Sequence, residues 1–154
     1  MEVKKILVPY NFTRNDQKAL DFVIQRYGQG GNVAITLFHA YTAVPKIDVS
    51  DKTVMKLINS NLAYLRQKIT ELEIELDKAK ERLIRAGFVG EKVHCEFKPL
   101  KGDLPQEIIN RVKSGGFSTI VLNHNPNKMK GFFTMSTSKK IMKSLPGVGI
   151  HMVV

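Results

Sequence analysis

Residues 4–23 read KKILVPYNFTRNDQKALDFV and contain the change of pattern that decides the fold of this 154-residue chain. The run Lys5–Pro9 is short and mostly apolar, which is typical of a parallel strand covered on both faces. A polar turn follows at Asn11–Thr13, and Thr13 can cap a helix over about Arg14–Tyr27. A buried strand, a polar turn and a helix therefore open the chain, as in an α/β fold.

The same alternation continues along the rest of the chain. The runs NVAITLFHAY, KVHCEFK, TIVL and IHMVV predict four further strands, at Asn32–Tyr41, Lys92–Lys98, Thr119–Leu122 and Ile150–Val154. Helical patterns lie between them, at about residues 51–86, 103–113 and 136–144. Strict alternation predicts a single α/β domain over residues 1–154, with a parallel sheet between two helical layers. In such sheets ligands bind beyond the carboxyl ends of the strands, where the winding direction reverses.

The predicted helix at about residues 51–86 is unusually long. About 36 helical residues would extend for roughly 54 Å, whereas a five-residue strand spans only about 17 Å. The helix must therefore break or extend past the sheet, and a coiled coil is an alternative to packing on the sheet. Its apolar residues recur at spacings of three and four, at Val54, Ile58, Leu62, Leu65, Ile69, Leu72, Leu76, Ala79, Leu83 and Ala86.

Composition limits the class of protein. Apolar residues make up 43% of the chain, which is enough for a core and too many for a disordered protein. No apolar run approaches the roughly 20 residues that span a bilayer, and the start MEVKKILVPYNF is not a secretory signal. The single cysteine, Cys95, excludes an internal disulfide. We expect a cytoplasmic protein without membrane contact.

The chain is strongly basic. It has 24 Lys and Arg against 14 Asp and Glu, a net charge of +10. Such a surface attracts anions, including nucleotides, nucleic acid and acidic proteins, although solubility alone is an alternative explanation. The lysines are spread along the chain, no run of five like charges occurs, and tryptophan is absent. Nucleic acid is therefore the less favoured partner.

No residue pattern indicates catalysis or a metal centre. The sequence contains no GxSxG, no Walker A pattern and no HExxH pair. Asp103 and Glu107 read as a helix cap and a first-turn charge rather than as a catalytic pair. We expect a protein that is not an enzyme and holds no metal beyond the Mg²⁺ that accompanies a nucleotide. The four histidines are scattered, at His39, His94, His124 and His151.

Five segments together resemble the universal stress protein family: KKILVPYNFTRNDQKALDFV, ITLFHAY, KGDLPQEII, FSTIVLNHN and GIHMVV. They are similar to the family's first strand, turn and helix, its second strand, its G-x-P-x-E-I segment and its last two strands. The resemblance covers almost the whole chain. It implies a flavodoxin-like, Rossmann-like three-layer sandwich with sheet order 3-2-1-4-5. In that order the turns beginning at Pro9–Asn11 and at Asn123 face each other.

The resemblance also implies a site. Nucleotide-binding members of the family hold ATP with a G-x2-G-x9-G-[S/T] motif after the fourth strand, which here reads N-x2-P-x9-S-T. The family's first-strand aspartate is replaced by Asn11. These changes matter because glycine lets the backbone approach a phosphate, and proline lacks an N–H donor. The residues implied for the nucleotide site are Pro9, Tyr10, Asn11, Ala40, Asn123, His124, Asn125, Pro126, Ser136, Thr137 and Ser138.

The resemblance implies a cytoplasmic stress-response or signalling protein with a degenerate ATP-type site. Ser136 and Thr137 stand at a helix N-terminus, which still favours an anion such as the phosphates of ATP. The alternatives are a dimeric scaffold that binds no nucleotide and a basic module that binds nucleic acid or acidic partners. The last strand, Ile150–Val154, pairs across dimers in the family, and an apolar edge strand favours a partner. We therefore expect a homodimer.

Overall fold

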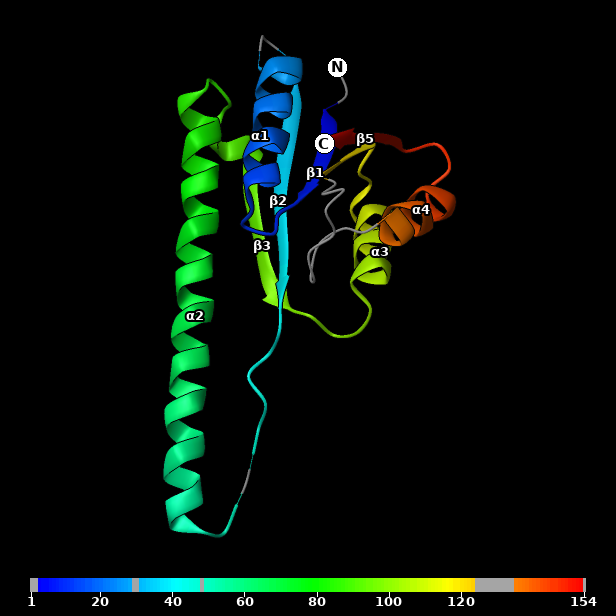
Figure 1. Cartoon of the computed structure of the whole chain (residues 1–154). Helices are drawn as coiled ribbons and strands as arrows, with labels where there is room; N and C mark the ends of the chain where they lie inside the picture. Colours follow the sequence, from blue (N-terminus) through cyan, green and yellow to red (C-terminus); the bar gives the residue numbers. More distant parts are fainter. Residues whose placement is uncertain (1–2, 29–30, 48, 124–134, 154) are drawn as a thin grey trace.

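The structure is a computed structural model that describes residues 3–28, 31–47, 49–123 and 135–153, without the side chains of residues 135 and 136. It confirms the predicted alternation of strands and helices (Figure 1). The elements are β1 (Lys4–Pro9), α1 (Arg14–Tyr27), β2 (Val33–Tyr41), α2 (Lys52–Arg85), the 3-10 helix η1 (Gly90–Lys92), β3 (Val93–Pro99), α3 (Leu104–Gly115), β4 (Thr119–Asn123), α4 (Met135–Ser144) and β5 (Gly149–Val153).

The strands form a five-stranded parallel sheet in the order β3-β2-β1-β4-β5, as predicted. In the central strand, Ile6 pairs with Ile35 of β2 on one side and with Thr119 of β4 on the other. Ile6, Leu7 and Val8 have no exposed surface, because both faces of a central parallel strand are covered by helices. The winding direction reverses between β1 and β4, so the switch point lies at the carboxyl ends of these two strands.

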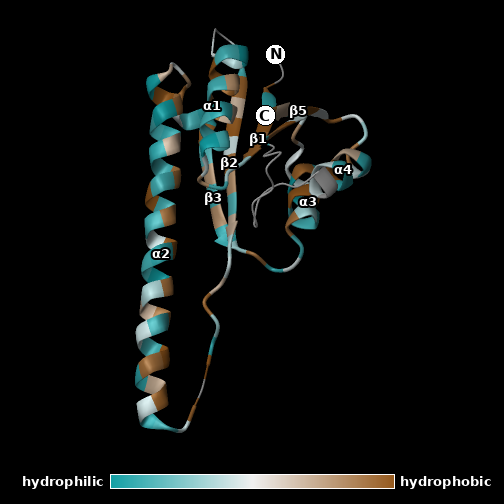
Figure 2. Cartoon of the chain, viewed as in Figure 1, coloured by the Kyte–Doolittle hydropathy of each residue, from teal (hydrophilic) through white to brown (hydrophobic). Residues whose placement is uncertain are grey.

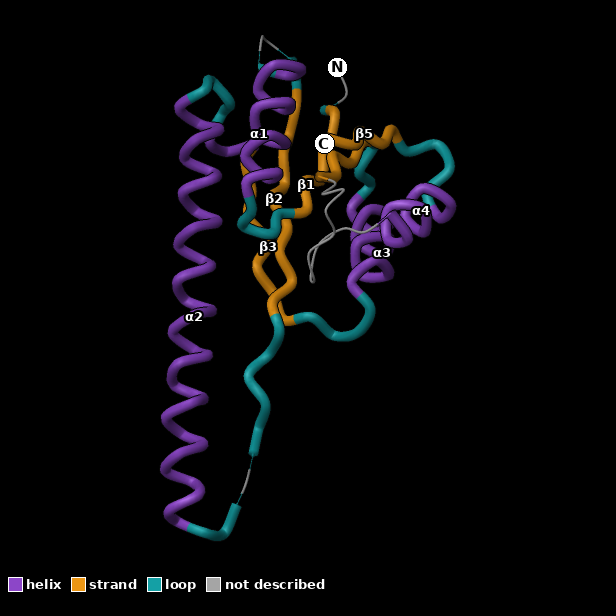
Figure 3. The backbone as a smooth tube through the Cα atoms, viewed as in Figure 1, coloured by secondary structure: helices purple, strands orange, loops and turns teal. Residues whose placement is uncertain are grey.

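Two helical layers cover the sheet. Helices α1 and α2 lie on one face, and α3 and α4 lie on the other (Figures 1 and 3). Ile6 and Val8 belong to the core beneath α1 and α2, whereas Leu7 belongs to the core beneath α3 and α4. This alternation follows the two-residue period of a strand. The strands β3 and β5 form the two edges of the sheet.

Helix α2 has 34 residues and does not break, so it extends past the sheet. Near its C-terminus, Leu76, Ala79 and Leu83 are buried in the core beside the sheet. Its first part, residues 52–72, projects beyond the sheet beside the loop that follows β2 (Figure 1), and we call it the overhang. Apolar residues continue along it (Figure 2). No described helix, α2 included, combines the length and apolar character needed to cross a bilayer.

The helix ends follow the sequence with small differences. Asp51 caps α2 by accepting hydrogen bonds from the N–H groups of Thr53 (2.8 Å) and Val54 (3.2 Å). Asp103 holds the N-cap position of α3, but its side chain makes no capping hydrogen bond. It accepts one from Nζ of Lys140 in α4 at 2.7 Å instead, so the predicted cap is replaced by an ion pair between helices.

Candidate functional site

The turn between β1 and α1 is organised around the buried carboxylate of Asp16. Its Oδ2 accepts hydrogen bonds from the backbone N–H of Asn11 (3.1 Å), from the N–H of Thr13 (2.7 Å) and from the Thr13 hydroxyl (2.9 Å). The residue between these donors, Phe12, has a φ of 64°. A non-glycine residue adopts this left-handed conformation only at a cost in free energy. Asp16 therefore holds a strained turn in place.

Asp16 also joins this turn to the end of β4. Nδ2 of Asn123 donates a hydrogen bond to Oδ1 of Asp16, and Asn123 is 1% exposed. Burial raises the pKa of the Asp16 carboxyl, against the hydrogen bonds from Thr13 and Asn11, which lower it. The two turns of the switch point thus meet through one buried carboxylate, as the strand order requires.

His39 links the end of β2 to the end of β1. Its Nδ1 lies 2.7 Å from the carbonyl oxygen of Tyr10, and because a carbonyl can only accept, Nδ1 carries the proton. Burial lowers the pKa of His39, although the bond to Tyr10 opposes this effect, so the ring is neutral at pH 7. The ring lies edge to face with Phe12, with centroids 4.8 Å apart, and stacks with Phe97 at 5.7 Å.

A cavity of about 630 Å³ opens beside these turns. Asn11 of the β1–α1 turn and Thr137 in the first turn of α4 both line it. Within the described residues, Nδ2 of Asn11 is buried and has no hydrogen-bond partner. A buried donor without an acceptor is destabilising, and a ligand that supplied an acceptor would remove that cost. The cavity also lies where the fold class places its ligands.

The comparison with known families decides the identity of this fold. The model of the universal stress protein family matches residues 2–147. The chain belongs to the universal stress protein family. A search of curated proteins found no match.

Solved structures with the same fold include other universal stress proteins. UspA from Lactobacillus plantarum is 14% identical, with 98% of this chain and 97% of that chain covered and a TM-score of 0.68. A universal stress protein from Archaeoglobus fulgidus in complex with dAMP is 11% identical, with 98% of each chain covered and a TM-score of 0.65. A universal stress protein in complex with cAMP is 12% identical, with 97% of this chain and 95% of that chain covered and a TM-score of 0.62. At these identities the likeness shows the fold.

In this universal stress protein the predicted site residues fall into three groups. Asn11, Ala40 and Thr137 line the cavity. Four others are buried and are not part of its lining: Pro9, Tyr10, Asn123 and Ser138. The remainder lie outside the description given by the structure, as whole residues for His124, Asn125 and Pro126 and as a side chain for Ser136.

The sequence did not predict the wall of the cavity that lies opposite Asn11 and Thr137. The overhang of α2 contributes Leu65, Lys68, Ile69 and Leu72, and the segments after β2 and β3 contribute the rest. No local motif identifies these residues, because their role depends on how far α2 extends past the sheet. It also missed the role of Asp16, although the spacing of Thr13 and Asp16 is that of a capping box.

The charges around the cavity suit an anionic group on its polar side. Asp103 lines the cavity, and the hydrogen bond from the Lys140 ammonium lowers the pKa of Asp103. Lys140 therefore balances the charge of this carboxylate. The N-terminal turn of α4 contributes a partial positive charge. Among the residues that the structure describes, no three His, Cys, Asp or Glu side chains gather to hold a metal ion.

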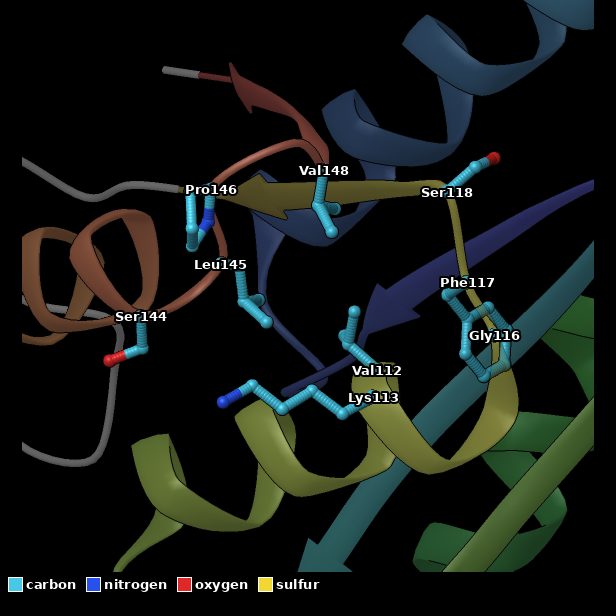
Figure 4. A pocket seen from close by; sticks show the side chains of 9 residues that line it. All are labelled: Val112, Lys113, Gly116, Phe117, Ser118, Ser144, Leu145, Pro146 and Val148. Carbon is cyan, nitrogen blue, oxygen red and sulfur yellow. The ribbon is translucent and has the colours of Figure 1, made fainter.

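A second cavity, of about 530 Å³, lies at the opposite end of the sheet (Figure 4). Its lining comes from the ends of α3 and α4 and from the residues before β4 and β5, among them Val112, Phe117, Leu145 and Val148. Among the described residues, Lys113 is the only charged one in this lining. Helix C-termini carry partial negative charge, and switch-point ligands bind at the other end of the strands. This cavity is therefore poorly suited to an anion.

Proposed function

We propose that this universal stress protein binds an adenine nucleotide in the switch-point cavity and acts as a cytoplasmic stress-response or signalling protein that is not an enzyme. The observation that carries the proposal is the convergence of Asn11 and Thr137, from the two sides of the switch point, on one cavity. The solved complexes of two relatives hold cAMP and dAMP, and both ligands are adenine nucleotides. ATP, accompanied by Mg²⁺, is the larger nucleotide that the altered motif suggests.

The two polar residues take different parts in the proposed complex. Thr137 stands in the first turn of α4, where the helix dipole favours a phosphate. Asn11 lines the cavity, and its buried Nδ2 has no partner among the described residues, so rotation of this amide toward the cavity would let it donate to an acceptor atom of the sugar or the base.

The position of Asn123 supports binding despite the altered motif. In the nucleotide-binding members that the chain resembles, this position is a glycine, and a larger residue could fill the space. Here the Asn123 side chain is engaged by Asp16 and does not line the cavity. The Asn123 side chain therefore does not fill the cavity, although it replaces the glycine.

Isothermal titration calorimetry with AMP and ATP, up to about 1 mM, tests the proposal. The wild-type chain should show saturable binding. Ala40→Phe should abolish it by filling the cavity, and Thr137→Val should weaken it about tenfold by removing a hydroxyl beside the phosphate. Lys113→Met, at the second cavity, is the matched control and should change nothing. Absence of heat from the wild-type chain with both nucleotides would contradict the proposal.

Two further expectations belong to the proposal. Nucleotide binding in a cavity should depend weakly on salt, whereas a basic module that neutralises several phosphates of a nucleic acid loses affinity steeply as salt rises.

The homodimer predicted through the last strand stays a prediction, and β5 does form an edge of the sheet. Sedimentation of the full chain measures that state directly.

A further inference from the structure

The switch-point cavity has two unlike sides. The polar side carries Asn11 and Thr137, whereas the overhang of α2 supplies the apolar side chains Leu65, Ile69 and Leu72. Helices α2 and α4 cover opposite faces of the sheet (Figure 1). Thr137 of α4 and the overhang therefore lie on opposite sides of the cavity.

The overhang exposes more apolar surface than a packed helix. Leu65 is 41% exposed, and Ile69 and Leu72 are half-buried. The same stripe is covered by the core further along the helix, where Leu76 has no exposed surface. Apolar surface left in water beside a cavity is unfavourable, and an apolar group of a ligand would be stabilised by covering it.

The cation on this wall does not interrupt its apolar character. Nζ of Lys68 lies 3.8 Å from Oε2 of Glu71 and 5.7 Å from the centroid of the Tyr64 ring. Both partners are exposed residues of the same helix. The ammonium group is therefore held by neighbours outside the cavity lining, and its aliphatic stem is the part that suits the wall.

The orientation of a bound nucleotide follows from these two sides. A phosphate at the first turn of α4 places the other end of the molecule, the base, toward the overhang. We propose that the ligand of this chain is an adenine nucleotide whose base carries an apolar substituent, and that Leu65, Ile69 and Leu72 bind that substituent. This inference rests on the proposed function, and it gives the extension of α2 past the sheet a role in ligand selection.

Calorimetry with AMP and N6-benzyl-AMP, on the full chain, tests the inference. The benzyl group covers apolar surface of the overhang, so N6-benzyl-AMP should bind about tenfold more tightly than AMP. Leu65→Gln and Ile69→Gln should each remove most of this preference, because they should weaken the binding of N6-benzyl-AMP much more than the binding of AMP. Leu57→Gln is the matched control, because Leu57 lies on the same overhang, is 66% exposed and does not line the cavity. It should leave both affinities unchanged.

The outcomes separate the two proposals. A chain that binds AMP but binds N6-benzyl-AMP equally or more weakly overturns the inference and leaves the proposed function in place. A chain that binds neither overturns the proposed function and the inference with it. Loss of the preference in Leu57→Gln as well as in Leu65→Gln also overturns the inference, since the effect would then not come from the cavity wall. Because Leu65 is partly exposed, Leu65→Gln keeps the test valid if Ile69→Gln fails to fold.

Discussion

The two parts of α2 share one sequence pattern and have different surroundings. In the part beside the sheet, Leu76, Ala79 and Leu83 are at most 5% exposed, whereas Leu65 in the overhang is 41% exposed. The spacing of three and four residues identifies the apolar face of a helix, but the reach of the sheet decides what covers that face. Beyond that reach Leu62 is still buried, at 6% exposed, whereas Leu65 stays partly in water and can take another role, which here is to line the cavity.

The largest difference between the two parts should appear in stability. Leu83→Ala should lower the free energy of unfolding by about 3 kcal/mol, because it leaves a cavity in the packed core. Leu65→Ala should lower it by less than about 1 kcal/mol, because this side chain is already partly in water. Urea unfolding of both variants without ligand measures the pair, and equal losses would show that the overhang is as well packed as the rest of the helix.

A thiol covered by the sheet-bound part of α2 should also react much more slowly than a thiol on the overhang. Sγ of Cys95 lies 3.8 Å from the carbonyl oxygen of Leu76, and burial, with a smaller effect of Asp77, raises the pKa of Cys95 to about 11. Alkylation of Cys95 at pH 8 should be about a hundredfold slower than that of a thiol introduced by Leu57→Cys, because the thiolate is the reactive form.

The pH dependence gives the control for this prediction. The rate at Cys95 should keep rising with pH up to about 11, whereas the rate at the introduced thiol should level off near its ordinary pKa of about 8.5. Mass spectrometry of the alkylated peptides separates the two sites. Equal rates would mean that α2 does not cover Cys95 in solution.

Glycine substitutions in the two parts of α2 should also differ in their effect on the free energy of unfolding, by a smaller amount. Ala79→Gly should lower the global free energy of unfolding by about 1 kcal/mol, because glycine is a poor helix former and Ala79 is packed on the core. Ala63→Gly, at an exposed position of the overhang, should leave it nearly unchanged. Hydrogen exchange should show the cost locally, with overhang amides exchanging about fivefold faster. Global destabilisation by Ala63→Gly would show that the helix unfolds as one unit.

The smallest effect concerns the polar contacts that hold the sheet-bound part of α2. Nη1 of Arg82 donates to Oε1 of Gln17 at 2.7 Å, and Arg82 also pairs with Asp21 of α1. Arg82→Met should cost less than about 1 kcal/mol at low salt and almost nothing at high salt. Lys78→Met, which removes an exposed pair with Glu75 of the same helix, should have no measurable effect. If Arg82→Met loses the same free energy of unfolding at low and at high salt, the loss comes from the packing of the Arg82 side chain and not from its charge.

The apolar runs predicted the strands, and the family resemblance implied their order and the polar side of the cavity, but neither predicted the contacts between distant elements. Apolar runs such as Lys5–Pro9 predicted the strands, and the family resemblance placed Asn11, Ala40 and Thr137 where they line the cavity. The direction of the Asn123 side chain could not be predicted, because it depends on a buried carboxylate at Asp16. The wall formed by the overhang depends on the reach of a whole helix, which no local pattern specifies.

The proposed nucleotide site is the switch-point cavity, and not the cavity at the opposite end of the sheet. Titration of the ¹⁵N-labelled full chain with AMP, followed by amide chemical shifts, distinguishes the two cavities. We expect shifts at Asn11, Ala40 and Thr137 and at Leu72 of the overhang, and no shifts at Lys113 or Leu145. Shifts confined to Lys113 and Leu145, or no shifts at saturating AMP, would contradict this proposal.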